Sequence, residues 1–291
     1  MKTVLIAGAT GYLGHYLVAE YRSRGWHVRA LVRAVGQGLE ADEFIEAEAT
    51  GPRTLGGICD GADLVVSSLG ITRQRDGLSY RDVDYQANVN LLEAALAAGV
   101  PRFDYVHVLG ADRMRHVPMV AAKAAFVERL QAAPIASTVV APSGYFSDMG
   151  DFLAMARSGR AWLFGGGAHR LNPIHGADLA VALADAVAAE RAWLDVGGPD
   201  VLTQAELATL AFDALHRPAR ITRLPGFLRQ AVLAVVPWVT PRHVSGPARF
   251  FLTALGMDMV GERHGTRHLA DWFAGGAEGE PRSAQPDTRS A

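Results

Sequence analysis

Three glycines, Gly8, Gly11 and Gly14, follow an apolar run at residues 4–7 and are spaced three residues apart. Gly8 would allow a tight turn, Gly11 would let the backbone approach a pyrophosphate, and Gly14 would let a helix pack closely on the strand. The first amide groups of that helix, from Tyr12 onward, would bind negatively charged oxygen atoms. Because a strand precedes this turn and a helix follows it, the pattern predicts a dinucleotide-binding site rather than an ordinary glycine-rich loop.

The second predicted strand, residues 27–32, indicates which dinucleotide binds. Arg33 stands at its end, where NAD-binding proteins carry an acidic residue that holds the ribose hydroxyls. A cation there suits the 2′-phosphate of NADP, which a carboxylate would repel. We therefore expect NADP(H) to be preferred over NAD(H). The alternative, that Arg33 is a solvated surface charge, stays open at this point.

Composition and charge narrow the class of protein. The 291 residues hold 28 Lys and Arg against 30 Asp and Glu, and this net charge of −2 gives no electrostatic reason to expect nucleic acid as a partner. Cys59 is the only cysteine, so an internal disulfide is excluded, no metal site is expected, and a reducing, cytoplasmic location fits. We expect Cys59 to be packed in a helix. Met1 and Lys2 lead directly into the first apolar run, so no signal peptide is expected.

Short apolar runs alternate with helix-like segments along the first half of the chain. The runs are at residues 4–7, 27–32, 44–47, 64–67, 105–109 and 138–141, and one intervening helix is expected over residues 82–99. This alternation predicts an α/β fold with a doubly wound, parallel Rossmann sheet that helices cover on both faces. Ligands of such sheets bind beyond the carboxyl ends of the strands, so the loops that start at residues 7, 32, 68, 109 and 141 should form the site.

We expect a single domain over residues 1–275, with a core over about residues 1–196 and a small, mainly helical C-terminal lobe over about 197–275. Thr203 and Glu206 have the spacing of a capping box, which predicts a helix that runs to about Leu215. Residues 276–291 are polar and lack aromatic side chains, so this tail is expected to be disordered.

An apolar stretch at residues 224–240 is interrupted by Arg229 and is expected to end its helix at Pro237. It is too short and too broken for a membrane span, which needs about 20 apolar residues. Two interpretations remain: a lobe helix packed over the substrate pocket, or a peripheral surface for a membrane or a protein partner. Substrate specificity is expected to lie in residues 145–170 and 224–260. The sequence assigns no oligomeric state.

Several blocks together resemble a known family. They are the glycine turn and the segments at residues 84–95, 99–103, 141–146 and 172–180. These blocks are similar to those of the atypical short-chain dehydrogenases/reductases, in the NmrA-like, NAD(P)H-binding group. That group includes reductases, isomerases and proteins that bind the cofactor without turnover. The residues expected to bind the cofactor are Gly8, Thr10, Gly11, Tyr12, Leu13, Gly14, Arg33, Ser68, Leu69, Gly70, Lys123, Pro142 and Gly144.

The chain departs from this family at the proton-transfer residues. Reductases of the superfamily place a serine after the fifth strand and a tyrosine four residues before a lysine. Here His107 stands at the serine position, Met119 replaces the tyrosine, and Lys123 alone is retained. The resemblance implies that Lys123 binds the nicotinamide ribose and that Asn88 supports it through water. The alternative, a solvated helix lysine, stays open.

Three residues are candidates for the chemistry. His107 has an ordinary pKa suited to acid–base work, Tyr145 follows a turn that lines the nicotinamide pocket in relatives, and Lys123 lends positive charge. His107 could equally be a core histidine, and we interpret His175 as structural, with Asp178 in the first turn of a helix. We expect an NADP(H)-dependent oxidoreductase that reduces a small apolar or conjugated substrate, such as an enone or a quinone. The alternative is a non-catalytic NADP(H)-binding redox sensor or assembly protein.

Overall fold

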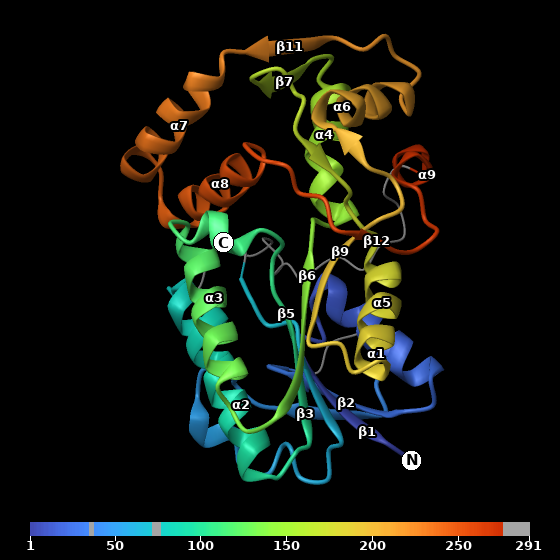
Figure 1. Cartoon of the computed structure of the whole chain (residues 1–291), viewed down its shortest axis with the longest axis vertical. Helices are drawn as coiled ribbons and strands as arrows, with labels where there is room; N and C mark the ends of the chain where they lie inside the picture. The colour runs from blue at the N-terminus through green and yellow to red at the C-terminus, as the bar shows by residue number, and fades with distance from the viewer. Residues whose placement is uncertain (35–37, 72–76, 276–291) are drawn as a thin grey trace, which may run out of the picture.

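The computed structural model describes residues 1–34, 38–71 and 77–275, and its centre is a parallel sheet of eight strands (Figure 1). The order across the sheet is β12-β9-β6-β5-β4-β1-β2-β3, and all its neighbouring strands pair in parallel. The strands are β1 (Thr3–Ala7), β2 (His27–Val32), β3 (Glu43–Glu46), β4 (Leu64–Ser67), β5 (Arg102–Val106), β6 (Ala136–Pro142), β9 (Trp193–Gly197) and β12 (Glu262–Arg263). The predicted doubly wound Rossmann sheet is therefore confirmed.

Helices cover both faces of the sheet because its central strands are apolar on both sides. Along β1, Val4 and Ile6 pack on the face covered by α1 (Tyr12–Ser23) and α5 (Gly176–Ala188). Leu5 and Ala7 pack on the opposite face, covered by α2 (Asn88–Ala97) and α3 (Pro118–Gln131) (Figure 1). The alternation of side chains along one strand thus supplies two separate cores.

A lobe stands beyond the carboxyl ends of the strands and holds a third core (Figure 1). Its helices are α4 (Gly150–Arg157), α6 (Gln204–Asp213), α7 (Gly226–Val239), α8 (Arg242–Ala254) and α9 (Leu269–Ala274). Its strands are β7 (Ala161–Phe164) paired with β11 (Ile221–Leu224), and β8 (Arg170–Leu171) paired with β10 (Leu202–Thr203). The Thr203–Glu206 capping box forms at the start of α6, as its spacing predicts.

Several predicted boundaries were wrong. The helix expected over residues 82–99 begins as a π-helical segment, Arg81–Ala87, and continues as α2. Strand β5 ends at Val106, so His107 lies just past the strand rather than within it. Cys59 is buried but belongs to a turn after the short 3-10 helix Pro52–Leu55, because glycines on both sides of it interrupt any longer helix. Strands β9 and β12 were missed.

The apolar segment also differs from the prediction. Helix α7 runs through Pro237 to Val239, because a proline in the last turn removes one hydrogen bond without ending the helix at once. Within the described residues, no helix is long and apolar enough to cross a membrane. The predicted disordered tail, residues 276–291, lies outside the part of the chain that the structure describes.

Candidate functional site

The glycine turn between β1 and α1 has the geometry that its spacing predicts. Gly8 has a φ of +82°, a backbone conformation that residues other than glycine rarely adopt. Its carbonyl accepts a hydrogen bond of 2.9 Å from the Gly11 N–H. A Cβ on Gly14 would overlap the Gly8 carbonyl oxygen, so α1 packs this closely only with glycine there. The residue before α1 is Gly11, which has no side chain to cap the helix. The first amide groups of α1 are therefore available to an anionic ligand.

A cavity of about 720 Å³ opens beside this turn, within the range of small-molecule and cofactor sites. It brings together most of the predicted site residues: Gly11, Tyr12, Leu13, Gly14, Arg33, Ser68, Gly70, His107, Lys123, Pro142, Gly144 and Tyr145. Among the described residues, Gly8, Thr10 and Leu69 are not part of the lining. Gly8 shapes the turn from beneath instead, through its hydrogen bond to Gly11. The loops at the carboxyl ends of the strands thus form one site.

The other side of the cavity is mostly apolar and comes from the lobe and α3. Its residues are Met119, Leu171, Phe250, Phe251, Ala254, Leu255, Met257 and Met259. Helix α8 supplies Phe250, Phe251 and Ala254, whereas no residue of α7 is found in the described lining. The lobe helix over the pocket is therefore α8, and the interpretation of residues 224–240 as that cover was wrong. The apolar wall suits a small apolar ligand.

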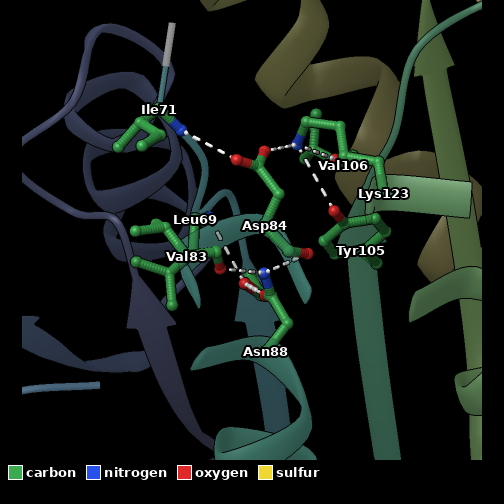
Figure 2. A network of polar contacts seen from close by, with 9 residues as sticks. Leu69, Ile71, Val83, Asp84, Asn88, Tyr105, Val106 and Lys123 are labelled. Carbon is green, nitrogen blue, oxygen red and sulfur yellow. Dashed lines mark hydrogen bonds and ion pairs between the residues drawn. The ribbon is translucent and has the colours of Figure 1, made fainter. Parts of the chain in front are cut away.

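Lys123 on α3 is held in a buried polar network (Figure 2). Its Nζ lies 3.3 Å from Asp84 Oδ1 and donates hydrogen bonds to Tyr105 Oη at 3.3 Å and to the Val106 carbonyl at 3.4 Å. Burial alone would lower the pKa of Lys123, but Tyr105 and Asp84 outweigh this effect and raise it. Lys123 is therefore a buried cation and not a solvated surface charge.

Asp84 was missed as a site residue, and the backbone explains how it reaches Lys123. It lies in the π-helical segment, a conformation that is frequent at functional sites. Its carboxylate is fully buried and accepts a hydrogen bond from the Ile71 N–H at 3.4 Å (Figure 2). It also lines the cavity. Burial raises the pKa of Asp84 to about 6, and Lys123 limits the rise. Its sequence signal was its place in the block at residues 84–95 that carries the family resemblance.

Gly70 and Asn88 keep this network in place. A Cβ on Gly70 would lie 2.8 Å from Asp84 Oδ1 and 2.9 Å from Lys123 Nζ, so a side chain there would push the pair apart. The Asn88 amide donates hydrogen bonds to the carbonyls of Val83 and Asp84, at 3.2 and 3.1 Å (Figure 2). Asn88 thus fixes the backbone that carries Asp84. A water-mediated link from Asn88 to Lys123 stays a prediction.

His107 and Met119 are placed beside Lys123 in the cavity lining. Met119 lies one helical turn before Lys123 on α3 and lines the same cavity, and its correspondence to the tyrosine of the family stays a prediction. His107 is buried, and its Nδ1 has no hydrogen-bond partner among the described residues. Burial, with the charges of Lys123 and Arg115, lowers the pKa of His107 to about 3. The imidazole is therefore neutral at physiological pH.

Tyr145 and Asp148 contribute polar groups at the start of the lobe. The Tyr145 N–H donates a hydrogen bond of 3.2 Å to Asp148 Oδ2, and both residues line the cavity. Burial raises the pKa of the Tyr145 hydroxyl, whereas Lys123 opposes the rise. Burial also raises the pKa of Asp148, to about 6. Asp148 is a second carboxyl group that sequence reasoning missed.

His175 and Asp178 are structural, as predicted for His175. The His175 Nδ1 accepts a hydrogen bond of 3.1 Å from the Ala177 N–H and so caps α5. Asp178 accepts hydrogen bonds from the Thr266 and Arg267 N–H groups at 3.2 and 3.0 Å and pairs with the Arg267 guanidinium. It therefore holds the segment before α9 on the core. In the described part of the chain, no group of three His, Cys, Asp or Glu residues could hold a metal ion.

The curated relatives are diverse in their named activities. The chain is 28% identical over 260 residues to divinyl chlorophyllide a 8-vinyl-reductase of Zea mays, a match that covers 80% of this chain and 64% of that protein. It is 28% identical over 151 residues to the photosystem II assembly factor Ycf39 of Guillardia theta, covering 50% of this chain and 48% of the relative. The matches thus span about half to two thirds of the length of these relatives.

Solved structures show the same fold. The NADPH-dependent quinone oxidoreductase of Escherichia coli in complex with NADPH has a TM-score of 0.72, with 18% identity over 94% of this chain and 100% of that one. A nucleoside-diphosphate-sugar epimerase of Staphylococcus aureus has a TM-score of 0.71, with 16% identity and the same coverage. The family model described as "NmrA-like family" matches residues 1–164, more than half of the chain. The chain belongs to the NmrA-like family, whose NAD(P)-binding Rossmann fold it carries.

Proposed function

We propose that this protein is an NADP(H)-dependent oxidoreductase that reduces a small, apolar, conjugated acceptor such as a quinone or an enone. The observation that carries the proposal is that the glycine turn, Arg33 and an apolar wall line the same cavity, where Met119 contributes a thioether and no proton donor. The names of two compared proteins, a quinone oxidoreductase and an 8-vinyl-reductase, are consistent with this class. The single, buried Cys59 supports a reducing, cytoplasmic location.

The residues present fit the proposed cofactor. The uncapped amide groups at the start of α1 would bind the pyrophosphate, and Arg33 at the end of β2 would bind the 2′-phosphate. Lys123 would donate a hydrogen bond to the nicotinamide ribose, with Asp84 and Tyr105 fixing the position of its Nζ. When bound, NADPH supplies the hydride. The apolar wall from α8 excludes water and holds the acceptor.

The loss of the tyrosine selects the class of acceptor. Simple carbonyl reduction needs a proton donor at the carbonyl oxygen, and the Met119 thioether donates no proton. A conjugated acceptor spreads the incoming charge over several atoms, so hydride can arrive before the proton. The unprotonated imidazole of His107 is unsuited to act as the acid at neutral pH. The later proton would come from Asp148, which lines the cavity and whose pKa burial raises to about 6, with Tyr145 binding the acceptor.

The test is a panel of quinones and enones, with NADPH oxidation followed by absorbance. We expect oxidation above the blank for at least one conjugated acceptor, and slower oxidation with NADH. Gly14→Ala, which cannot keep the glycine turn, is the control for contaminating reductases. Tight NADPH binding without oxidation by any acceptor in the panel would contradict the proposed activity.

A second candidate is a non-catalytic NADP(H)-binding sensor or assembly protein. The observation in its favour is that Asp84 balances the charge of Lys123 while the tyrosine is absent, so the cavity could bind the cofactor without turnover. Half of the chain is similar to an assembly factor. A sensor is expected to bind NADPH and NADP⁺ with unequal affinities and to change its oligomeric state between them, with no turnover.

A further inference from the structure

Helix α7 exposes an apolar face to solvent. Its outer stripe consists of Phe227, Gln230, Ala231, Ala234, Val235 and Trp238, which are all exposed and follow helical spacing. Phe227 is 68% exposed, Val235 52% and Trp238 86%. A surface helix ordinarily turns polar residues outward, whereas only Gln230 is polar in this stripe. The outer stripe therefore exposes mostly apolar side chains to water.

The opposite side of α7 contacts the rest of the protein. Arg229 donates a hydrogen bond of 2.9 Å from Nη1 to the Leu252 carbonyl, which joins α7 to α8. Figure 1 shows α8 between α7 and α3, with α7 at the edge of the molecule. No residue of α7 is fully buried. A contiguous exposed apolar face of this kind on a seated helix marks an interaction surface.

The charge around α7 indicates the chemistry of the partner. Residues 214–257 contain six arginines and no Asp or Glu, although the whole chain holds about one acidic residue in ten. Arg217, Arg220 and Arg223 come before α7 in the sequence, and all three are exposed. Arg217 donates a hydrogen bond to the Arg157 carbonyl and Arg223 to the Gly166 carbonyl, and neither pairs with a carboxylate among the described residues.

We propose that α7 docks in the surface of a membrane that contains anionic lipids. The outer stripe would lie among the headgroups and the flanking arginines would face lipid phosphates, the arrangement of an interfacial amphipathic helix. Trp238 at the end of the helix suits this depth, because tryptophan favours the boundary between apolar and polar regions. With 14 residues, α7 lies in the plane of the membrane.

A second copy of the chain fits this surface less well. A two-fold symmetric contact between two α7 helices would place the same patch on both partners and bring their flanking arginines toward one another. An anionic lipid surface instead attracts these arginines. Because α8 packs against α7 and lines the cavity, the docked helix is one helix removed from the proposed substrate site.

The experiment is flotation of the full chain with vesicles of phosphatidylcholine, with and without phosphatidylglycerol. We expect binding to the anionic vesicles, weakened by salt, and about tenfold weaker binding for Val235→Glu, which places a charge among the headgroups. Val181→Glu, at an exposed valine on α5, is the matched control and should bind like the wild type. Val235 is exposed, so the variant should keep the fold, which circular dichroism checks.

Brominated lipids give a second readout. They should quench the fluorescence of Trp238, so Trp238→Phe should lose most of the quenching, whereas Trp162→Phe, at an exposed residue of β7, should keep it. Equal binding to both kinds of vesicle would overturn the assignment to anionic lipid. Absence of vesicle binding, or a dimer that Val235→Glu dissociates, would assign the outer stripe to a protein contact and overturn the proposal.

Discussion

Replacing Lys123 with methionine tests the buried pair at the centre of the site. Methionine keeps most of the apolar stem and removes the charge, which leaves the Asp84 carboxylate buried without its cation. The Asp84 side chain is fully buried and that of Lys123 is 13% exposed, so water screens the pair poorly. Removing one partner of a buried ion pair costs about 3–5 kcal/mol of unfolding free energy. We expect Lys123→Met to be destabilised by that amount at pH 8.

This destabilisation should depend on pH with a definite sign. The pKa of Asp84 is about 6 in the folded protein, above its ordinary value of 3.8, and without Lys123 it should rise further. The folded variant therefore binds a proton that the unfolded chain does not, so its stability increases as the pH falls through the folded pKa. By pH 5 the Asp84 carboxyl group is neutral, and the difference from the wild type should fall to about 1 kcal/mol or less.

Urea unfolding at a series of pH values measures both effects. The double variant Lys123→Met with Asp84→Asn should recover most of the lost stability at pH 8, because it leaves no unpaired charge. The control is Lys2→Met. Lys2 is the other lysine of the chain and is exposed. A destabilisation below 1 kcal/mol at pH 8, or one that does not vary with pH, would refute the proposed burial and pairing of Asp84 and Lys123.

Three further predictions concern the cofactor and the proton. Arg33→Ala should weaken NADPH binding by about 1.5–3 kcal/mol in calorimetry and leave NADH binding unchanged, since the lost contact is to the 2′-phosphate; Arg24→Ala, an arginine outside the cavity lining, should change neither. Turnover should fall as the pH rises through about 6, where Asp148 loses its proton, and Asp148→Asn should be slower with no fall there; a fall retained in the variant would assign the proton to another group. Gly14→Ala should abolish NADPH binding and lower the melting temperature, because its Cβ overlaps the Gly8 carbonyl; unchanged binding would show that the turn is not the pyrophosphate site.

The fold and the glycine turn were predictable because they depend on local patterns. A few neighbouring residues are enough to recognise the apolar strands β1, β2 and β4. The same holds for the glycines between β1 and α1, because the turn geometry requires them. The strand β9 was missed because its Trp193 and Asp195 face outward, so its five residues contain no continuous apolar run. The two-residue strand β12 carries too little pattern to be found.

The polar side of the site depended on tertiary contacts that no local pattern shows. Asp84 reaches Lys123 only because a π-helical segment lies next to α3, and the carboxylate of Asp148 acquires its raised pKa from burial. Whether α7 or α8 covers the cavity also depends on tertiary contacts. Both segments are apolar enough to pack inward, and contacts across the lobe decide which one does.

The most direct measurement of the central claim is a single turnover of bound NADPH. The protein is saturated with NADPH and mixed rapidly with a quinone in excess, while the absorbance of the reduced cofactor is followed. The account predicts a decay whose rate rises with quinone concentration and then saturates, and which Gly14→Ala lacks. Bound NADPH that persists at saturating concentrations of every quinone and enone tested would contradict an oxidoreductase acting on a conjugated acceptor.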